Sequence, residues 1–260
     1  MSHLSVENLK IVERPFRRSW FRYDFEERGL IDDLSFSVDR GESLGIVGEE
    51  KSGKKALVEA ILKLREVESG SIVFAEVETT RLGRRHFRRL RKRMQAVFPD
   101  GDDPLTPEWT VDAMFREALQ LWYAGETREQ WHQRIESVMV LCELPEAVRV
   151  LYPSELDAVE RQQVALARAL LVQPEFLLVF DYTRGLDVVQ EAELLNLLRK
   201  VREELRITML VVTDDLAVAH QLSDAIGVLH AGRLLEIGPA ETIVNRPEHD
   251  YTRRLVSCSL

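Results

Sequence analysis

The chain has 260 residues, of which 45% are hydrophobic and 30% are charged. This balance predicts one sizeable globular domain, or a domain with a subdomain, and excludes a disordered or fibrous protein. Lysine and arginine number 35 and aspartate and glutamate 44, so the net charge of −9 disfavours nonspecific binding to nucleic acid or acidic lipid. The two cysteines and six histidines are too few and too scattered to predict a disulfide framework or a metal cluster.

The apolar runs of the chain are short. Those at residues 176–180 and 207–212 fall far short of the roughly 20 residues that span a bilayer. The first nine residues lack the basic segment and apolar core of an export signal. We therefore expect no transmembrane helix and a cytoplasmic location.

The first elements alternate between strand and helix. Apolar and polar residues alternate over residues 34–39, which predicts a half-buried strand, and the turn at Arg40-Gly41 leads into a second strand at 43–47. After a glycine-bearing loop, Leu57, Ile61 and Leu64 recur at helical spacing. A β-rich run follows at 71–75.

Helical periodicity dominates residues 109–144. Beyond it, short apolar runs at 176–180, 207–212 and 225–229 are separated by helical patterns at 189–205 and 216–222. This alternation predicts a largely parallel sheet covered by helices.

One motif carries chemistry. Residues 48–54 have the G-x-x-x-x-G-K spacing of a phosphate-binding loop, and they lie between a predicted strand and a predicted helix, as such a loop does. The alternative interpretation is a loop in which glycine and lysine occur at this spacing by chance. In such loops the backbone N–H groups and the lysine bind phosphates, and a following Ser or Thr binds Mg²⁺. Lys55 takes that last position here. The candidate nucleotide-binding residues are Gly48, Glu50, Lys51, Ser52, Gly53, Lys54 and Lys55.

Further segments resemble the ATP-binding-cassette (ABC) transporter ATPases. The family's signature helix is similar to YPSEL at 152–156 followed by RQQVALARAL at 161–170, and Leu186-Asp187 resembles the end of its D-loop. EIG at 236–238 and PEHDYTRRL at 247–255 resemble the C-terminal segment of the oligopeptide, dipeptide and Sap-type antimicrobial-peptide importers. The likeness extends from about residue 4 to the end of the chain.

The resemblance implies an α/β fold, a P-loop NTPase core of the ABC ATPase type with an N-terminal antiparallel β part. The whole chain, 1–260, is then one nucleotide-binding domain with a helical subdomain inserted at about 104–173 and an importer-branch segment at about 236–260. It also implies a head-to-tail dimer with a second ABC ATPase subunit beneath two membrane-spanning permease subunits, at the inner face of the membrane. Each ATP would lie between one subunit's P-loop and the other's signature, and an extracytoplasmic solute-binding protein would be an indirect partner.

The metal-binding pair expected of this family is incomplete. Mg²⁺ would need the P-loop hydroxyl and an aspartate ending an apolar strand, with a glutamate beside it to position water. An alignment without gaps makes that pair Phe180-Asp181, and a shift of one residue makes it Asp181-Tyr182. Either register leaves one carboxylate, so Asp181 is the candidate catalytic residue, and we expect no well-held Mg²⁺ and assign no metal ligand.

Two further family positions are also altered. The glutamine expected after the strand ending at Phe98 is replaced by Pro99, and Gln95 belongs to the strand itself. The histidine expected to contact the γ-phosphate is replaced by Asp214, a carboxylate that would repel phosphate.

The glycine-rich stretch of the signature is replaced by residues 157–160. Ala158 and Val159 place Cβ atoms where backbone N–H groups would approach phosphate. Asp157 and Glu160 have the spacing of a capping box, in which the side chains satisfy those N–H groups internally. The changes at the P-loop, at Asp181 and at Asp214 therefore affect the ATP site on this chain. The changes at residues 157–160 affect the ATP site that this chain's signature completes on the partner subunit.

Two other features invite interpretation. Seven cations and no acid lie within residues 84–93, and Phe87 and Leu90 at helical spacing indicate one amphipathic helix whose basic face is solvated or faces a membrane subunit. The nucleic-acid interpretation is the lesser one. Candidates for an aromatic residue that stacks on adenine are Phe16, Trp20, Phe21 and Tyr23.

The sequence therefore predicts an ABC-type subunit of a peptide importer. We expect this subunit to hydrolyse ATP poorly or not at all and to have a structural or regulatory role. Its binding of ATP would be weak or independent of metal. One alternative is an active ATPase that uses Asp181 as general base and Lys55 for part of the metal's charge. Another is a nucleic-acid-binding or regulatory module built on the same scaffold, and we do not expect nucleic acid as a partner.

Overall fold

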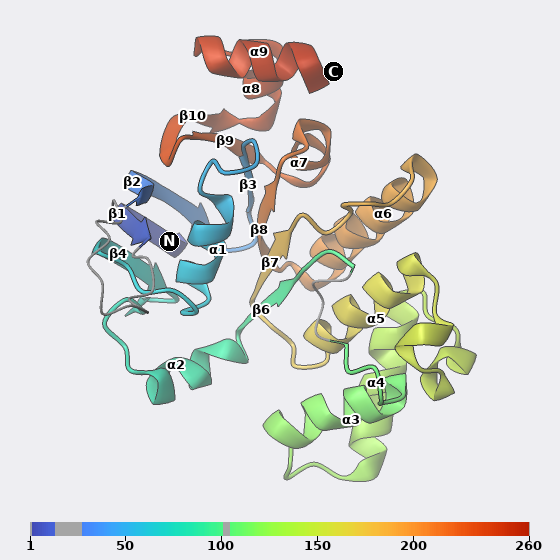
Figure 1. Cartoon of the computed structure of the whole chain (residues 1–260). Coiled ribbons are helices and arrows are strands. Elements are labelled where there is room, and N and C mark those ends of the chain that lie inside the picture. Colours follow the sequence, from blue (N-terminus) through green and yellow to red (C-terminus); the bar gives the residue numbers. More distant parts are fainter. Residues whose placement is uncertain (1, 14–27, 101–104, 260) are drawn as a thin grey trace, which may run out of the picture. The chain divides into compact units, whose positions relative to one another are not determined.

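The computed structural model describes residues 2–13, 28–100 and 105–259. These form two compact units, one made of residues 1–87 and 212–260 and the other of residues 88–211, with the described elements of each shown in Figure 1. None of the described helices is both long and apolar enough to cross a bilayer.

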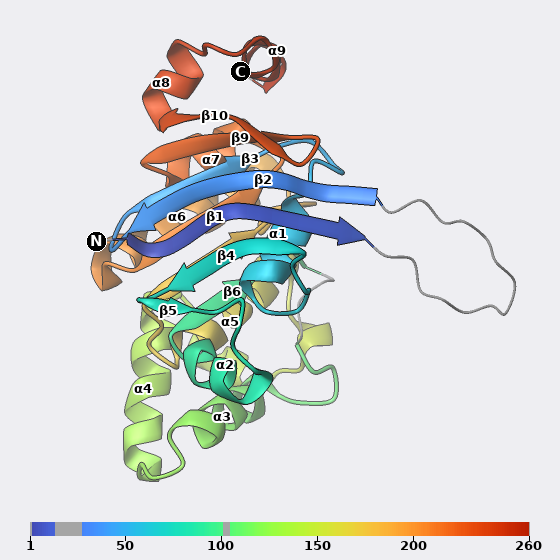
Figure 2. The same cartoon turned by 90° about the vertical axis from the view of Figure 1, so that its left-hand side faces the viewer.

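The first unit contains an antiparallel sheet. Its four strands lie in the order β2-β1-β4-β5 and pair antiparallel throughout, as Figure 2 shows. Their bounds are Ser2–Glu13 (β1), Arg28–Asp39 (β2), Ser69–Phe74 (β4) and Val77–Glu78 (β5). In β2, Leu34, Phe36 and Val38 are buried while the residues between them are exposed. The predicted N-terminal antiparallel part is confirmed.

The same unit holds the strand that leads to the P-loop motif. Strand β3, Ser43–Val47, is buried along its whole length and pairs parallel with β9, Ala225–His230, which in turn pairs antiparallel with β10, Arg233–Pro239. An all-apolar or neutral strand of this kind is typical of a sheet covered on both faces. The helices of this unit are α1 (Lys54–Ile61), α7 (Leu216–Leu222), α8 (Ala240–Asn245) and α9 (Asp250–Ser259). Strand β8, Thr208–Thr213, spans the boundary between the units.

Helix α1 is shorter than the sequence pattern predicts. It ends at Ile61, and Leu64, at the expected helical spacing, lies outside it with 64% of its surface exposed. Lys63 adopts a positive φ of 56°, which turns the chain out of the helix. The apolar spacing at Leu64 was therefore misleading.

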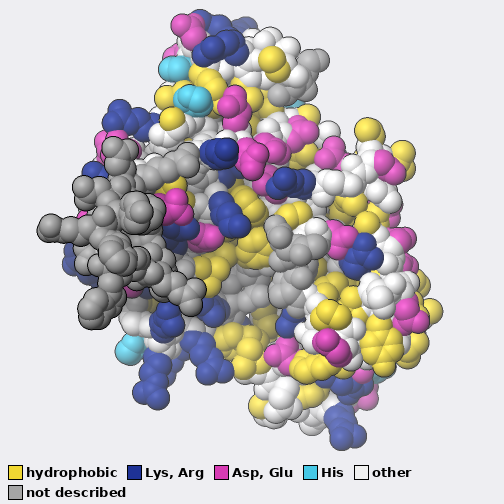
Figure 3. Space-filling view, viewed as in Figure 1, with side chains coloured by type: hydrophobic (Ala, Val, Ile, Leu, Met, Phe, Trp, Pro, Cys, Tyr) yellow, Lys and Arg dark blue, Asp and Glu magenta, His cyan; other side chains and the backbone are white. Residues whose placement is uncertain are grey.

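The basic segment forms a helix as predicted. Helix α2, Arg84–Arg91, buries Phe87 and Leu90 and exposes its arginines. Figure 3 shows Lys and Arg side chains gathered where α2 lies in Figure 1. The element is amphipathic, and its cations face solvent.

The second unit combines a pair of parallel strands with a helical group. Strand β6, Met94–Val97, pairs parallel with β7, Phe176–Phe180. The helices are α3 (Val111–Trp122), α4 (Arg128–Leu141), two short 3-10 helices (Glu146–Val150 and Pro153–Glu155), α5 (Ala158–Leu170) and α6 (Val188–Leu205). Helices α3, α4 and α5 pack on one another, as Figure 1 shows. The predicted helical nature of 109–144 is confirmed; the bounds 104–173 of an inserted subdomain stay a prediction.

Candidate functional site

The P-loop motif forms a loop between β3 and α1, the arrangement expected from the sequence. Gly53 has a φ of +110°, and a Cβ atom there would collide with the Leu30 carbonyl oxygen and the Ile31 side chain. A Cβ atom at Gly48 would collide with the Leu229 carbonyl oxygen. Both glycines are therefore required by the backbone itself.

Backbone hydrogen bonds fix the shape of this loop. The Gly48 N–H donates to the Thr213 carbonyl at 3.3 Å, and the Ser52 N–H donates to the Glu49 carbonyl at 3.1 Å. The Gly232 N–H donates to the Ser52 carbonyl at 2.8 Å. The loop is thus held at both ends by segments distant in sequence.

The start of α1 suits an anion. Lys54 is buried, with its ammonium group donating to the Gly48 carbonyl, and the buried Ser52 hydroxyl has no hydrogen-bond partner among the described residues. The Gly53 N-cap supplies no side-chain oxygen, and the first turn carries no acid. Two lysines at the positive end of a helix dipole cost about 0.3–1 kcal/mol each, which a bound phosphate would offset.

The residues of the motif do not suit a divalent cation. Lys55 occupies the position of the metal-binding hydroxyl and is exposed at the start of α1. An ammonium group cannot ligate Mg²⁺, which requires oxygen donors. Glu49, Glu50 and Lys51 are exposed on the loop.

Asp181 is the first residue after β7. Its side chain is buried and its backbone has a φ of +42°. Neither neighbour can supply the second carboxylate: the Phe180 ring packs edge-on against Phe98 with 6.1 Å between centroids, and Tyr182 is buried with its hydroxyl donating to the Gln162 carbonyl. Gln162 returns a hydrogen bond from Nε2 to the Tyr182 carbonyl at 2.9 Å.

The two positions that normally read the γ-phosphate are also changed in the structure. Pro99 is buried after β6, and Gln95 lies within β6 and donates to the Arg91 carbonyl, so it is a strand residue as predicted. Asp214 is exposed after β8, and Asp215 beside it caps α7 by accepting from the Ala217 N–H at 2.7 Å. Acidic residues therefore occupy the end of β8.

The N-terminus of α5 is closed by its own side chains. Asp157 Oδ1 accepts from the Glu160 N–H at 2.8 Å, and Glu160 Oε2 accepts from the Asp157 N–H at 3.0 Å. The predicted capping box is confirmed. Val159 is buried, so its Cβ atom belongs to the packing of α5. The helix end that would face phosphate is already satisfied and carries two carboxylates.

An ion pair next to this helix end was not foreseen from the sequence. Arg161 donates to the Asp100 carboxylate from Nε at 2.9 Å and from Nη2 at 2.7 Å. The hydrogen bonds to Asp100, opposed by burial, raise the pKa of the Arg161 guanidinium. Nothing in the spacing of the two residues, one in a loop and one in a helix, indicates this contact.

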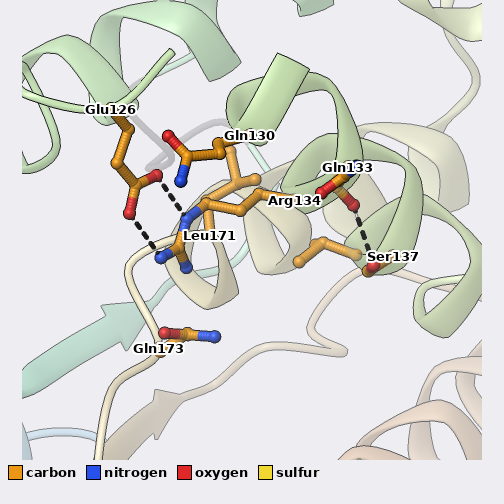
Figure 4. Close-up of a pocket in the computed structure, with 8 residues that line it drawn as sticks. Glu126, Gln130, Gln133, Arg134, Ser137, Leu171 and Gln173 are labelled. Atoms are coloured by element: carbon orange, nitrogen blue, oxygen red, sulfur yellow. Dashed lines mark hydrogen bonds and ion pairs between the residues drawn. The ribbon is translucent and has the colours of Figure 1, made fainter. Parts of the chain in front are cut away.

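A pocket in the second unit holds none of the predicted site residues. It has a volume of about 320 Å³ and lies along α4, as Figure 4 shows. Arg134 in its wall donates to both Glu126 carboxylate oxygens, at 2.8 and 2.7 Å, and its guanidinium lies 4.0 Å from the centre of the Tyr123 ring. These contacts give Arg134 a structural role.

Four candidate adenine-stacking aromatics, Phe16, Trp20, Phe21 and Tyr23, lie outside the described residues. Within the described ranges, no group of three or more His, Cys, Asp or Glu side chains is placed to hold a metal ion. The phosphate-binding loop thus fits a nucleotide's phosphates, whereas Lys55 at the end of the motif offers no oxygen donor for Mg²⁺.

Comparison with known proteins decides the family. The ABC transporter family model matches residues 31–183. The chain belongs to the ABC transporter family. It is 36% identical over 228 residues to a putative peptide import ATP-binding protein of Brucella ovis, covering 88% of this chain and 72% of that protein. It is 33% identical to the oligopeptide transport ATP-binding protein OppF of Bacillus subtilis, covering 87% of this chain and 75% of that protein.

Solved structures agree on the ABC ATPase fold. The dimeric ATP-binding cassette MJ0796, in a post-hydrolysis state bound to ADP and Pi, has a TM-score of 0.78 and 22% identity, covering 91% of this chain and 98% of that one. The cbiO1 protein of Clostridium perfringens, part of the cbiONQ transporter complex, has a TM-score of 0.80 and 22% identity, covering 94% of this chain and 91% of that one. The predicted α/β P-loop fold is confirmed.

Proposed function

We propose that this chain is the ATP-binding subunit of a peptide importer in which ATP hydrolysis is weak or absent and the subunit serves a structural or regulatory role. The names of its relatives at 36% and 33% identity support the peptide importer assignment. The chain's own residues at the ends of β7 and β8 and at the start of α5 support the impairment.

Nucleotide binding is supported by the loop that precedes α1. The buried Lys54, the positive φ of Gly53 and the Ser52 hydroxyl, which has no partner in the described part of the chain, offer donors and space for phosphate oxygens. The contacting segment would consist of Gly48, Glu50, Lys51, Ser52, Gly53, Lys54 and Lys55. With Lys55 beside the phosphates instead of a metal-binding hydroxyl, binding would not depend on Mg²⁺.

The main support for weak hydrolysis is the pair of residues that follows strand β7, where only one carboxylate is present. Asp181 is flanked by Phe180, packed on Phe98, and by Tyr182, hydrogen-bonded to Gln162. One carboxylate therefore stands where metal binding and water positioning need two. If metal, water positioning and γ-phosphate contacts each contribute a few kcal/mol, losing them together removes most of an enzyme's advantage over the uncatalysed reaction.

The ATP site formed by the partner's P-loop and this chain's signature would also be impaired. In a head-to-tail dimer with a second ABC ATPase, the N-terminus of α5 would face the partner's nucleotide. Asp157 and Glu160 close that helix end with their own carboxylates, which would repel a triphosphate.

The same proposal defines the surroundings of the chain. It would work at the cytoplasmic face of the membrane beneath two membrane-spanning permease subunits, with a solute-binding protein as an indirect partner. Residues 104–173 would form the subdomain nearest the permeases, and 236–260 the segment typical of the importer branch.

Phosphate release tests the proposal. The purified chain, alone and with the second ABC ATPase of its own transporter, should release phosphate from ATP no faster than the matched Lys54→Ala chain under the same conditions. Release well above that control would overturn it. If such release is unchanged in Asp181→Asn, Asp181 is excluded as its general base.

A further inference from the structure

The C-terminal helix α9 reaches the phosphate-binding loop through Tyr251. This side chain is 8% exposed and belongs to a buried cluster that includes Val47, the last residue of β3 before Gly48. Its hydroxyl lies beside Glu49 of the loop without forming a well-aligned hydrogen bond. The start of the loop therefore lies next to a side chain some 200 positions away in the sequence.

Tyr251 also contacts the segment that holds the other end of the loop. Its ring packs on His230, the last residue of β9, with 4.1 Å between centroids and 37° between planes. Two residues later, the Gly232 N–H donates to the Ser52 carbonyl at 2.8 Å. The Tyr251 side chain thus lies beside Glu49 of the loop through its hydroxyl, and through its ring it packs on the strand that leads to the turn bonded to Ser52.

The start of α9 is fastened to β10. Both carboxylate oxygens of Glu236 are engaged, one accepting from the Glu248 N–H at 2.9 Å and the other from the His249 N–H at 3.1 Å. His249 Nδ1 then accepts from the Tyr251 N–H at 3.1 Å, which fixes the backbone that carries the ring. A helix N-terminus capped in this way by a residue from another element is held in place by that element.

We propose that Tyr251 is a positioning residue for the phosphate-binding loop, and that the segment 236–255 sets the conformation of residues 49–52 through it. A movement of α9 would then loosen the loop and lower the affinity for a triphosphate. The effect on nucleotide rests on the function proposed above, whereas the effect on the loop does not.

The electrostatics agree with this role. Burial, and then the Glu49 carboxylate beside it, raises the pKa of Tyr251 to about 12. The phenol therefore stays neutral next to the Glu49 carboxylate.

Hydrogen exchange in the nucleotide-free, full-length chain tests the proposal. In Tyr251→Ala the backbone N–H groups of residues 49–53 should exchange about tenfold faster, equivalent to ~1.4 kcal/mol less free energy of local opening. Tyr251→Phe keeps the ring on His230 and in the cluster that includes Val47, and it removes only a hydroxyl without a well-aligned hydrogen bond, so its loop should exchange like the parent. Ser257→Ala, an exposed position on α9, serves as the matched control.

The Leu34 and Phe36 N–H groups of strand β2 report on global destabilisation, because these residues lie in the other sheet of the same unit and away from Leu30, Ile31 and Asp32, which contact the loop and the Gly232 turn. Faster exchange in the loop with unchanged exchange in β2 supports the proposal. Faster exchange in α9 with an unchanged loop overturns it. If Tyr251→Ala does not fold, Glu236→Ala, which frees the start of α9 without altering the ring, must give the same loop-specific result.

A separate titration with a fluorescent ATP analogue distinguishes this inference from the proposed function. If the parent chain binds no analogue while Tyr251→Ala still loosens the loop, nucleotide binding fails and the positioning role stands. If the parent binds and Tyr251→Ala binds equally well with an unchanged loop, the positioning role fails alone.

Discussion

Asp157 and Glu160 each accept a hydrogen bond from the other's backbone N–H across the first turn of α5. This reciprocal contact closes the helix end that, in an open signature, would be available to phosphate. It is also a stabilising feature that can be measured without nucleotide.

Removing this cap should lower stability by a predictable amount. We expect Asp157→Ala to lower the free energy of unfolding by about 1 kcal/mol, because the Glu160 N–H loses its acceptor. The measurement is urea unfolding followed by circular dichroism. Glu193→Ala, at an exposed position in the interior of α6, is the control and should change stability by less than about 0.5 kcal/mol. Equal effects of the two changes would show that the capping contact contributes nothing.

Replacing Tyr182 by glutamate should destabilise the chain and restore no activity. The side chain is 2% exposed and its hydroxyl donates to the Gln162 carbonyl, so a carboxylate there would be a buried charge without a partner. We expect a loss of about 3 kcal/mol or more in the free energy of unfolding. Tyr182→Phe removes only the hydroxyl and should cost about 1–3 kcal/mol. A Tyr182→Glu chain as stable as its parent would contradict the described packing.

The two cysteines should differ sharply in reactivity. Cys142 is fully buried at the C-terminus of α4, and burial raises the pKa of its thiol to about 12, whereas Cys258 is exposed. A disulfide reagent at pH 8 should therefore modify Cys258 quickly and Cys142 only when the protein opens. Cys258→Ser should abolish the fast phase, and Cys142→Ser should leave it unchanged. A fast phase that survives in Cys258→Ser would contradict the burial of Cys142.

The attachment of α9 should weaken in acid. Burial alone would raise the pKa of Glu236, but hydrogen bonds from the Glu248 and His249 backbone N–H groups, together with the nearby Thr252 hydroxyl, hold it below its ordinary value of 4.5. A lowered pKa means that the carboxylate stabilises α9 fully above pH 4.5 and loses this effect as the pH falls through the lower, folded-state pKa. Exchange of the α9 N–H groups, corrected for intrinsic rates, should accelerate in that range.

Glu236→Gln is the control for this pH dependence. It keeps an acceptor oxygen but does not titrate, so its α9 should already be less protected at neutral pH and should show a flatter response to acid. The same acid response in Glu236→Gln and in the parent would assign the effect to another group.

Local patterns allowed much of the fold to be predicted. The alternation at Leu34, Phe36 and Val38, the glycines of the P-loop and the capping box at Asp157 are determined by neighbours within a few residues, and each has the expected structure. The helical spacing of apolar residues was misleading at Leu64, because the chain leaves α1 after Ile61 and turns at Lys63, which has a positive φ.

Contacts between distant segments could not be predicted in the same way. The sequence marked EIG and PEHDYTRRL as related to a family branch, but nothing in their spacing shows that Glu236 caps α9 or that Tyr251 lies beside Glu49. The hydrogen bond between Tyr182 and Gln162 could not be predicted from the sequence either, because Gln162 is 20 positions away on another element. The roles assigned to Asp181 and to residues 48–55 stay predictions.

The central proposal is that this chain lacks the ligands for Mg²⁺ but binds the phosphates of a nucleotide through the loop at residues 48–55. The most direct measurement is the dissociation constant of a fluorescent, slowly hydrolysed ATP analogue, with Lys54→Ala as the control for binding through the loop, in excess Mg²⁺ and in EDTA. With Lys55 at the hydroxyl position and one carboxylate at Asp181, we expect the two constants to agree within about threefold, less than 1 kcal/mol. An affinity that falls a hundredfold or more when Mg²⁺ is removed would contradict the account.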